Sequence, residues 1–266
     1  MTQELNTAPW YGSLAAATTR CGVPAVVLAS VGFQDEPQAL ELDWVRLEHA
    51  GVLERLGTID DPAERADLFH HYLVTTVWSQ TSGHGVISAR PDLDVATLVR
   101  GWGVDSNRTS GAILKAWAQS RFGLRPIFHR TELVDADAQE RFAQEGHRGV
   151  VGPLPPQLDL LYTYTQDELA RRYPGQHWLT LWRGTHDPER YELKSDGTSA
   201  LVEFNTISSF TCNPEIAWEF GARVWRVDVP LAKIVLAPGT LPPQYLQGEQ
   251  ECLVLGGDYR VHVEIG

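Results

Sequence analysis

The sequence predicts an α+β protein in which a mainly helical part, residues 1–155, precedes a sheet-rich part, residues 156–266. Apolar residues recur at helical spacing through the first part, whereas β-branched and aromatic runs bounded by turn residues dominate the second. Helices and strands do not alternate along the chain, as a doubly wound fold requires. We therefore expect one domain over residues 1–266, in which the helical part packs on the sheet.

Four helices are predicted in the stretch before residue 176. Asp60 or Asp61 can cap the first, in which Pro62 takes the first helical position and apolar residues follow at helical spacing. The second, "SNRTSGAILKAWAQSRFGL", ends at a glycine shortly before a proline, and the third covers "DADAQERFAQEG". The fourth, "TQDELARRYPG", begins with a predicted capping box from Thr165 to Glu168.

Strands are predicted in the last third of the chain at "WLTLWRG", "ARVWRVDVPL", "KIVLAPG" and "CLVLGGDYRVHVEI". The last of these predicts a hairpin that turns at Gly256 and Gly257. One helix lies among the strands, where Asn213 can cap and Pro214 can start "NPEIAWEFG".

The composition excludes several classes of protein. A net charge of −12 argues against nucleic-acid binding, which needs a basic surface. The three cysteines lack CxxC spacing and the nine histidines lack ligand spacing, so no metal is predicted. Phosphate-loop and GxSxG motifs are absent, and "GWGVDS" fails the dinucleotide fingerprint. Without a signal peptide or a long apolar run, we expect a cytoplasmic protein with no membrane span.

Two polar groups in the sheet-rich part are candidates for a site. Arg183 ends an apolar strand, where a guanidinium needs an anion, and Gly184 after it would let a ligand approach the backbone. The plain alternative is a surface arginine that extends past a tryptophan. Ser209 and Thr211 would share one face of a strand, with Phe210 on the other. Their plain alternative is a strand end followed by a helix cap.

A third group lies in "LQGEQECLVL", where a proline- and glycine-rich loop becomes a strand. Glu249 and Glu251 would face the same side of an extended segment, and two neighbouring carboxylates repel each other. The plain alternative is a solvated acidic turn. Surface loops of this kind often carry binding or catalytic groups.

The order of these three groups resembles the Arg–Ser–Glu signature of ADP-ribosyltransferases, and the Glu-x-Glu form resembles their arginine-modifying branch. Longer stretches resemble the dinitrogenase reductase ADP-ribosyltransferases of nitrogen-fixing bacteria. They include "DSNRTSGAILKAWAQSRFGLRPIFHR", "LLYTYTQDELARRYPGQHWLTLWRGTHD" and the segment from "SSFTCNPEIAWEFG" to "QGEQECLVLGGDYRV". The resemblance covers residues 40 to 264.

The resemblance implies a split antiparallel β-sandwich that binds NAD⁺ as a co-substrate. It implies that Glu251 binds the ribose 2′-hydroxyl and stabilises positive charge at C1′, while Glu249 holds the acceptor guanidinium. It assigns the pyrophosphate to Arg183 and the nicotinamide amide to the backbone of Gly184.

A serine that orients Glu251 is also implied by the resemblance. Ser209 lies where the family's first serine lies. The family usually has Ser-Thr-Ser at this point and this chain has Ser-Phe-Thr, so Ser208 and Thr211 stay open as alternatives.

The loop at 239–248 would recognise the acceptor protein, with Tyr245 as a contact. The resemblance names that acceptor as dinitrogenase reductase, the iron protein of nitrogenase, and implies control by a PII-type signalling protein. Competing interpretations are an NAD glycohydrolase, a non-catalytic module that binds NAD⁺ or a regulatory protein, and a glycosidase with paired carboxylates.

Overall fold

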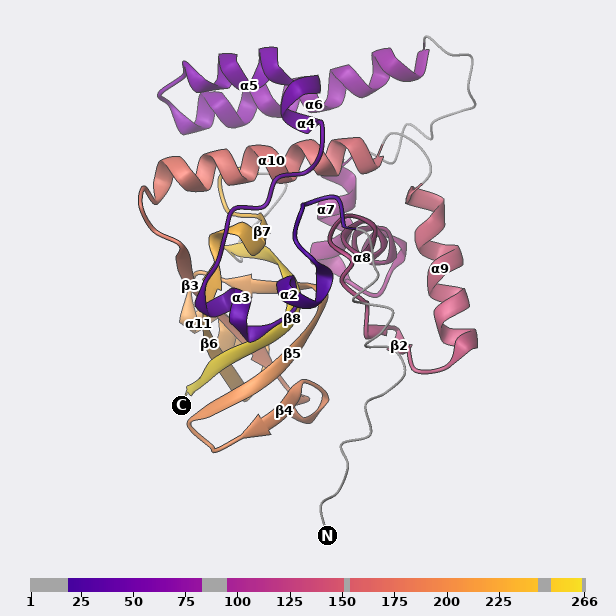
Figure 1. Cartoon of the computed structure of the whole chain (residues 1–266), viewed down its shortest axis with the longest axis vertical. Coiled ribbons are helices and arrows are strands. Elements are labelled where there is room, and N and C mark those ends of the chain that lie inside the picture. Colours follow the sequence, from indigo (N-terminus) through magenta and orange to yellow (C-terminus); the bar gives the residue numbers. More distant parts are fainter. Residues whose placement is uncertain (1–18, 83–94, 151–153, 244–249, 265–266) are drawn as a thin grey trace.

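The computed structural model describes residues 19–82, 95–150, 154–243 and 250–264. Helices and one short strand pair make up the first part of the chain (Figure 1). They are α2 (Ala25–Leu28), α3 (Val31–Asp35), α4 (Val45–Glu48), α5 (Ala50–Gly57), α6 (Pro62–Ser82), α7 (Val95–Val104), α8 (Thr109–Phe122), β1 (Phe128–His129), β2 (Thr131–Glu132), α9 (Ala136–Val150) and α10 (Leu154–Arg172).

A six-stranded antiparallel sheet follows, in the order β4-β5-β3-β6-β8-β7. Its strands are β3 (Trp178–Thr185), β4 (Glu192–Ser195), β5 (Ser199–Thr211), β6 (Arg223–Pro230), β7 (Ile234–Leu236) and β8 (Glu251–Glu264), with α11 (Pro214–Glu219) between β5 and β6. Because β5 also pairs with β8, the strands β5, β3, β6 and β8 form a closed ring of pairings. The predicted α+β class is confirmed.

Within the ring, β3 and β5 share the fewest paired residues. Among the described residues these two strands share a single registered pair, Trp182 with Thr211. In contrast, β5 pairs with β8 along most of its length, ending with Thr211 opposite Glu251. The end of β5 and the start of β8 therefore meet beside Trp182 of β3.

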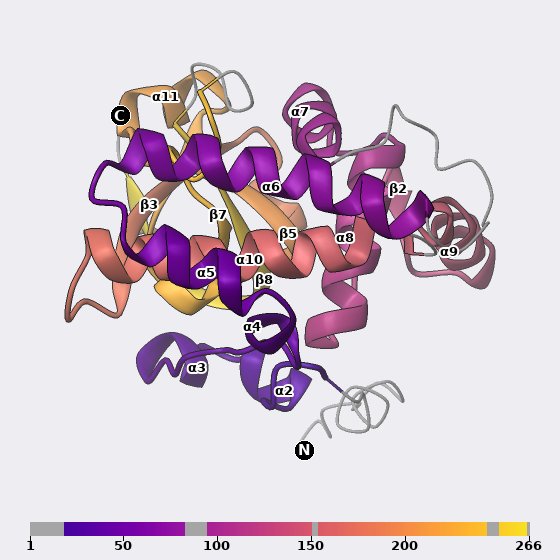
Figure 2. The same cartoon turned by 90° about the horizontal axis from the view of Figure 1, so that it is seen from above.

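Strands β5 and β8 separate two apolar cores. Ile207 and Leu253 belong to the larger core, which they share with the helices. Phe210 and Cys252 belong to the second core, which lies between the strands. Figures 1 and 2 show α10 between the sheet and the α5–α6 pair. The alternation of side chains thus gives each strand one face toward the helices.

Local start and stop signals identify the helix ends. The Asp61 carboxylate accepts from the backbone N–H of Ala63 at 2.7 Å, as predicted for the start of α6. The Asn213 side chain accepts from the backbone N–H of Glu215 at 3.0 Å and caps α11. Gly123, with φ of +67°, ends α8. These predictions are confirmed.

The predicted capping box is wrong. Thr165 and Glu168 lie inside α10, which runs without a break from Leu154 to Arg172. The adjacent Pro155 and Pro156 occupy its first turn, where backbone N–H groups have no partner within the helix. Helical structure therefore extends beyond residue 155, to residue 172.

The predicted hairpin at Gly256 and Gly257 is also wrong, because β8 continues through both glycines. A Cβ at Gly256 would lie 2.0 Å from the carbonyl oxygen of Asn205, where the register with β5 shifts. Gly257 has φ of +106°, and a Cβ there would lie 2.6 Å from the carbonyl oxygen of Ala29. The glycines allow a bulge and a close approach rather than a turn.

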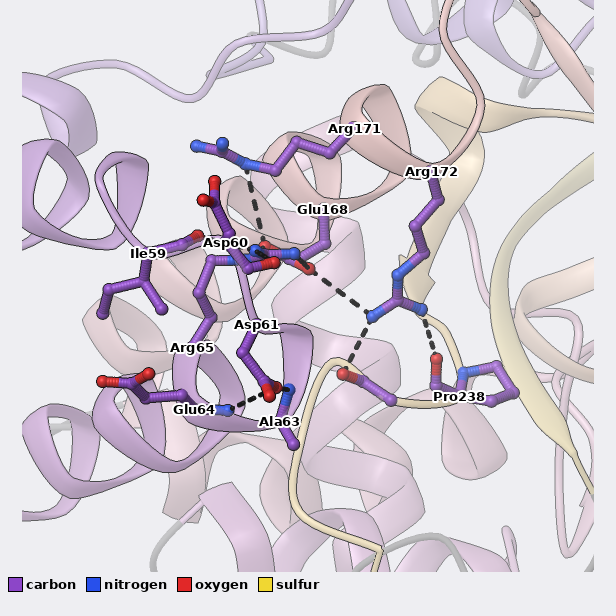
Figure 3. Close-up of polar contacts among 11 residues, drawn as sticks. Ile59, Asp60, Asp61, Ala63, Glu64, Arg65, Glu168, Arg171, Arg172 and Pro238 are labelled. Carbon is purple, nitrogen blue, oxygen red and sulfur yellow. Dashed lines mark hydrogen bonds and ion pairs between the residues drawn. The ribbon is translucent and has the colours of Figure 1, made fainter.

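A buried ion pair joins α6 to α10. The Glu168 carboxylate accepts from Nε and Nη2 of Arg65 at 2.6 and 2.9 Å. Arg172 lies 3.6 Å from Glu168 and donates to the carbonyl oxygens of Pro238 and Gly239 (Figure 3). This network, Arg65–Glu168–Arg172, connects α6 and α10 to the segment that follows β7. No helix in the described ranges is long and apolar enough to cross a membrane.

Candidate active site

Arg183, on β3, reaches across to β5. Its Nη1 donates to the carbonyl oxygen of Ser209 at 2.6 Å. Its guanidinium carbon lies 5.7 Å from the centre of the Tyr191 ring and 6.0 Å from that of Phe210. Its Nε is buried and has no hydrogen-bond partner among the described residues. The Arg183 side chain is therefore held against β5 and does not extend along the surface.

Ser209, Thr211 and Glu251 share one face of the β5–β8 ladder. Thr211 is directly opposite Glu251, and Ser209 lies two residues before it on the same side. Ser208 faces the opposite side, where it is buried and its hydroxyl donates to the carbonyl oxygen of Asn205 at 3.4 Å. Of the three hydroxyl residues considered, two therefore lie on the face of Glu251.

Glu251 is the first residue of β8, and 7% of its surface is exposed. The residue before it, Gln250, has φ of +47°, which is uncommon outside glycine. The carbonyl oxygen of Gln250 accepts from the N–H of Cys212 at 3.3 Å, so the turn into β8 is tied to the end of β5. This hydrogen bond fixes the backbone at the point where Glu251 enters β8.

Gly184 is needed for packing. A Cβ at this position would lie 1.9 Å from the carbonyl oxygen of Ala217 in α11. Likewise, a Cβ at Gly221 would lie 2.2 Å from the backbone of Thr185. The two glycines allow α11 to lie directly on β3. The role of the Gly184 backbone toward nicotinamide stays a prediction.

Glu249 and Tyr245 lie outside the described residues. The first glutamate of the pair and the acceptor contact therefore stay predictions, as does the role of the loop at 239–248.

Lys115, on α8, is a buried cation near Arg183. Burial lowers the pKa of Lys115 to about 8, the nearby Asp105 carboxylate raises it, and the charge of Arg183 lowers it further. Lys115 Nζ donates to the carbonyl oxygens of Ser106 and Phe128, each at 3.1 Å. These hydrogen bonds hold the buried ammonium between α8, the turn after α7 and β1.

Trp102 is a site residue that the sequence does not identify, because the "GWGVDS" stretch fails the dinucleotide fingerprint and carries no other motif. Its indole Nε1 donates to Ser209 Oγ at 2.8 Å. The local signal was a tryptophan between two glycines in a helix, which indicates close packing but not the identity of the partner.

The chain belongs to the dinitrogenase reductase ADP-ribosyltransferase (DRAT) family, whose model matches residues 18–263. A relative from Rhodospirillum rubrum is 31% identical over 261 residues, which cover 92% of this chain and 94% of that protein. That relative is described as NAD(+)--dinitrogen-reductase ADP-D-ribosyltransferase. No solved structure matches this chain significantly.

Proposed function

We propose that this protein transfers ADP-ribose from NAD⁺ to an arginine of dinitrogenase reductase, inactivates that protein and releases nicotinamide. Membership of the DRAT family carries the proposal. The hydrogen bond from Arg183 to Ser209 and the diagonal position of Glu251 on the same face as Ser209 support it, because these residues come from distant segments. The strand ring of β5, β3, β6 and β8 supports a split antiparallel β-sandwich.

The chemistry needs positive charge to be stabilised at C1′ of the ribose. Nicotinamide leaves as a neutral molecule and takes the electron pair of the C1′–N bond, so no acid is required. A glycosidase, in contrast, must protonate its leaving group. Glu251 would bind the 2′-hydroxyl and stabilise the oxocarbenium-like transition state more than the ground state.

The acceptor guanidinium then attacks C1′ and forms the new C–N bond. Glu249 would orient this group and take the proton that it loses. Arg183 would hold the pyrophosphate with its planar fork, and the Gly184 backbone would bind the nicotinamide amide. We assign the support of Glu251 to Ser209 rather than to Ser208, since Ser208 faces away from it. Thr211, directly opposite Glu251 on the same face, stays the alternative.

The acceptor and the regulator are proposed as protein partners. An acidic chain, with a net charge of −12, suits a target that presents an arginine. The loop at 239–248, with Tyr245, would contact the iron protein. A PII-type signalling protein would control the activity.

The test is incubation with NAD⁺ and purified iron protein, followed by mass analysis of arginine-containing peptides. Replacing Glu251 by glutamine (Glu251→Gln) should lower nicotinamide release at least about 100-fold with little change in NAD⁺ binding. Glu219→Gln is the matched control, because it removes the same charge at an exposed position of α11, and it should keep full activity. Release that is unchanged in Glu251→Gln would contradict the mechanism.

Glu249→Gln separates the transferase from an NAD glycohydrolase. Transfer to arginine should be abolished while hydrolysis of NAD⁺ by water largely remains. Intact transfer would show that Glu249 does not hold the acceptor. A non-catalytic binding module predicts that the unmodified protein binds NAD⁺ and releases no nicotinamide.

A further inference from the structure

The end of α7 brings two consecutive residues of the helical part to the site. Trp102 is 3% exposed, and its indole N–H contacts Ser209 Oγ at 2.8 Å. A Cβ at Gly103 would lie 3.7 Å from Oε2 of Glu251. Trp102 and Gly103 therefore lie against the serine and the carboxylate on which the proposed function rests.

The indole is held from several sides. Trp102 belongs to the larger apolar core. A Cβ at Gly101 would lie 2.4 Å from Ser110 Oγ, so glycine allows α7 to pack closely against α8. The ammonium of Lys115 lies 5.8 Å from the centre of the Trp102 ring and ties the carbonyl oxygen of Ser106, in the turn after α7, to α8. The N–H of Trp102 has little freedom to point elsewhere.

The direction of this hydrogen bond determines what Ser209 can do. An indole N–H donates and cannot accept, so the Ser209 oxygen must be the acceptor. The single O–H of Ser209 is then left to donate to another group. Glu251 lies diagonally across the ladder on the same face, and a diagonal neighbour is within reach of a long side chain. The backbone of Ser209 is meanwhile held by Arg183.

We propose that Trp102 is a positioning residue that acts through Ser209. Its N–H occupies the acceptor side of the Ser209 hydroxyl and directs the hydroxyl proton toward the Glu251 carboxylate. The inference rests on the proposed function and adds to it. The helical part of the chain contributes directly to the geometry of the site instead of only covering the sheet.

The test is a double-mutant cycle on nicotinamide release with Trp102→Phe, Ser209→Ala and the double variant. Trp102→Phe should lower kcat about tenfold and change KM for NAD⁺ by less than about twofold. The double variant should match Ser209→Ala, because the indole has no effect without its partner. Two effects that multiply independently would overturn the inference.

Trp117→Phe is the matched control. Trp117 is also buried in the larger core, and its indole N–H donates to Asp159 at 2.7 Å, away from the site. The Trp117→Phe variant should lose thermal stability with no change in kcat. If Trp102→Phe does not fold, 3-benzothienylalanine at position 102 keeps the ring shape and replaces N–H by sulfur. Full kcat in that variant would overturn the inference.

The two proposals fail in different ways. If the unmodified protein releases no nicotinamide from NAD⁺, the proposed function fails. The role of Trp102 alone fails under a different set of results: the unmodified protein releases nicotinamide, Glu251→Gln abolishes this release, and Trp102→Phe keeps full kcat.

Discussion

Glu168→Gln should cause a large loss of stability, because it removes the negative charge from the Arg65–Glu168–Arg172 network. The side chains of Arg65 and Glu168 are only 6% and 2% exposed, and two N–O contacts of 2.6 and 2.9 Å join them. Glutamine could still accept one hydrogen bond, but the guanidinium of Arg65 would stay buried without a counter-charge.

Removing one partner of a buried pair costs about 3–5 kcal/mol in the free energy of unfolding. At about 2–4 °C per kcal/mol for a chain near this size, the melting temperature should fall by roughly 10 °C. The assay is thermal and urea unfolding followed by circular dichroism. Asp167→Asn, at the neighbouring position of α10, is the control. Its contacts with Arg46, at 2.7 and 3.2 Å, are partly exposed and should contribute about 1 kcal/mol or less.

A loss below about 1 kcal/mol for Glu168→Gln would refute this reasoning, as would equal losses in the two variants. The double replacement Arg65→Met with Glu168→Leu tests the cause. It should recover much of the loss, since apolar groups of similar volume need no counter-charge.

Three further predictions concern single residues. Burial lowers the pKa of Lys233 from 10.5 to about 7, so between these pH values the unfolded chain binds more protons and stability rises with pH. Lys233→Met should flatten this rise in pH-dependent urea titrations and stabilise the protein at pH 7 by on the order of 4 kcal/mol. Gly184→Ala should lower the melting temperature by displacing α11, because its Cβ would overlap the carbonyl oxygen of Ala217. Asn213→Ala removes the cap of α11 and should cost about 1 kcal/mol in chemical denaturation.

Elements with local signals could be predicted from the sequence, and elements determined by distant neighbours could not. Asp61 and Asn213 identify helix starts because their side chains bond N–H groups two residues ahead. Gly256 and Gly257 carry an equally strong turn signal, but a bulge in β5 and the backbone of Ala29 determine their conformation. No local pattern contains that information.

The candidate site shows the same division. Strand geometry alone predicts that Ser209 and Thr211 lie on the same face of a strand, and the structure shows this arrangement. The approach of Arg183 to Ser209 was expected only from a family resemblance, because no spacing rule relates β3 to β5. The contact of Trp102 with Ser209 joins a helix to a strand more than a hundred positions later, and nothing local predicts such a pairing.

The apolar core shared by the helices and the strands has a practical consequence for anyone who wishes to shorten this protein. Ile207, Leu253 and Leu255 on the strands pack in one cluster with Trp117 and Leu161 on the helices. A fragment that begins at β3, at Trp178, would lack these helices and present those strand side chains to water, and bare apolar faces of this kind promote aggregation. The helices and the sheet should be expressed, melted and engineered as one cooperative unit.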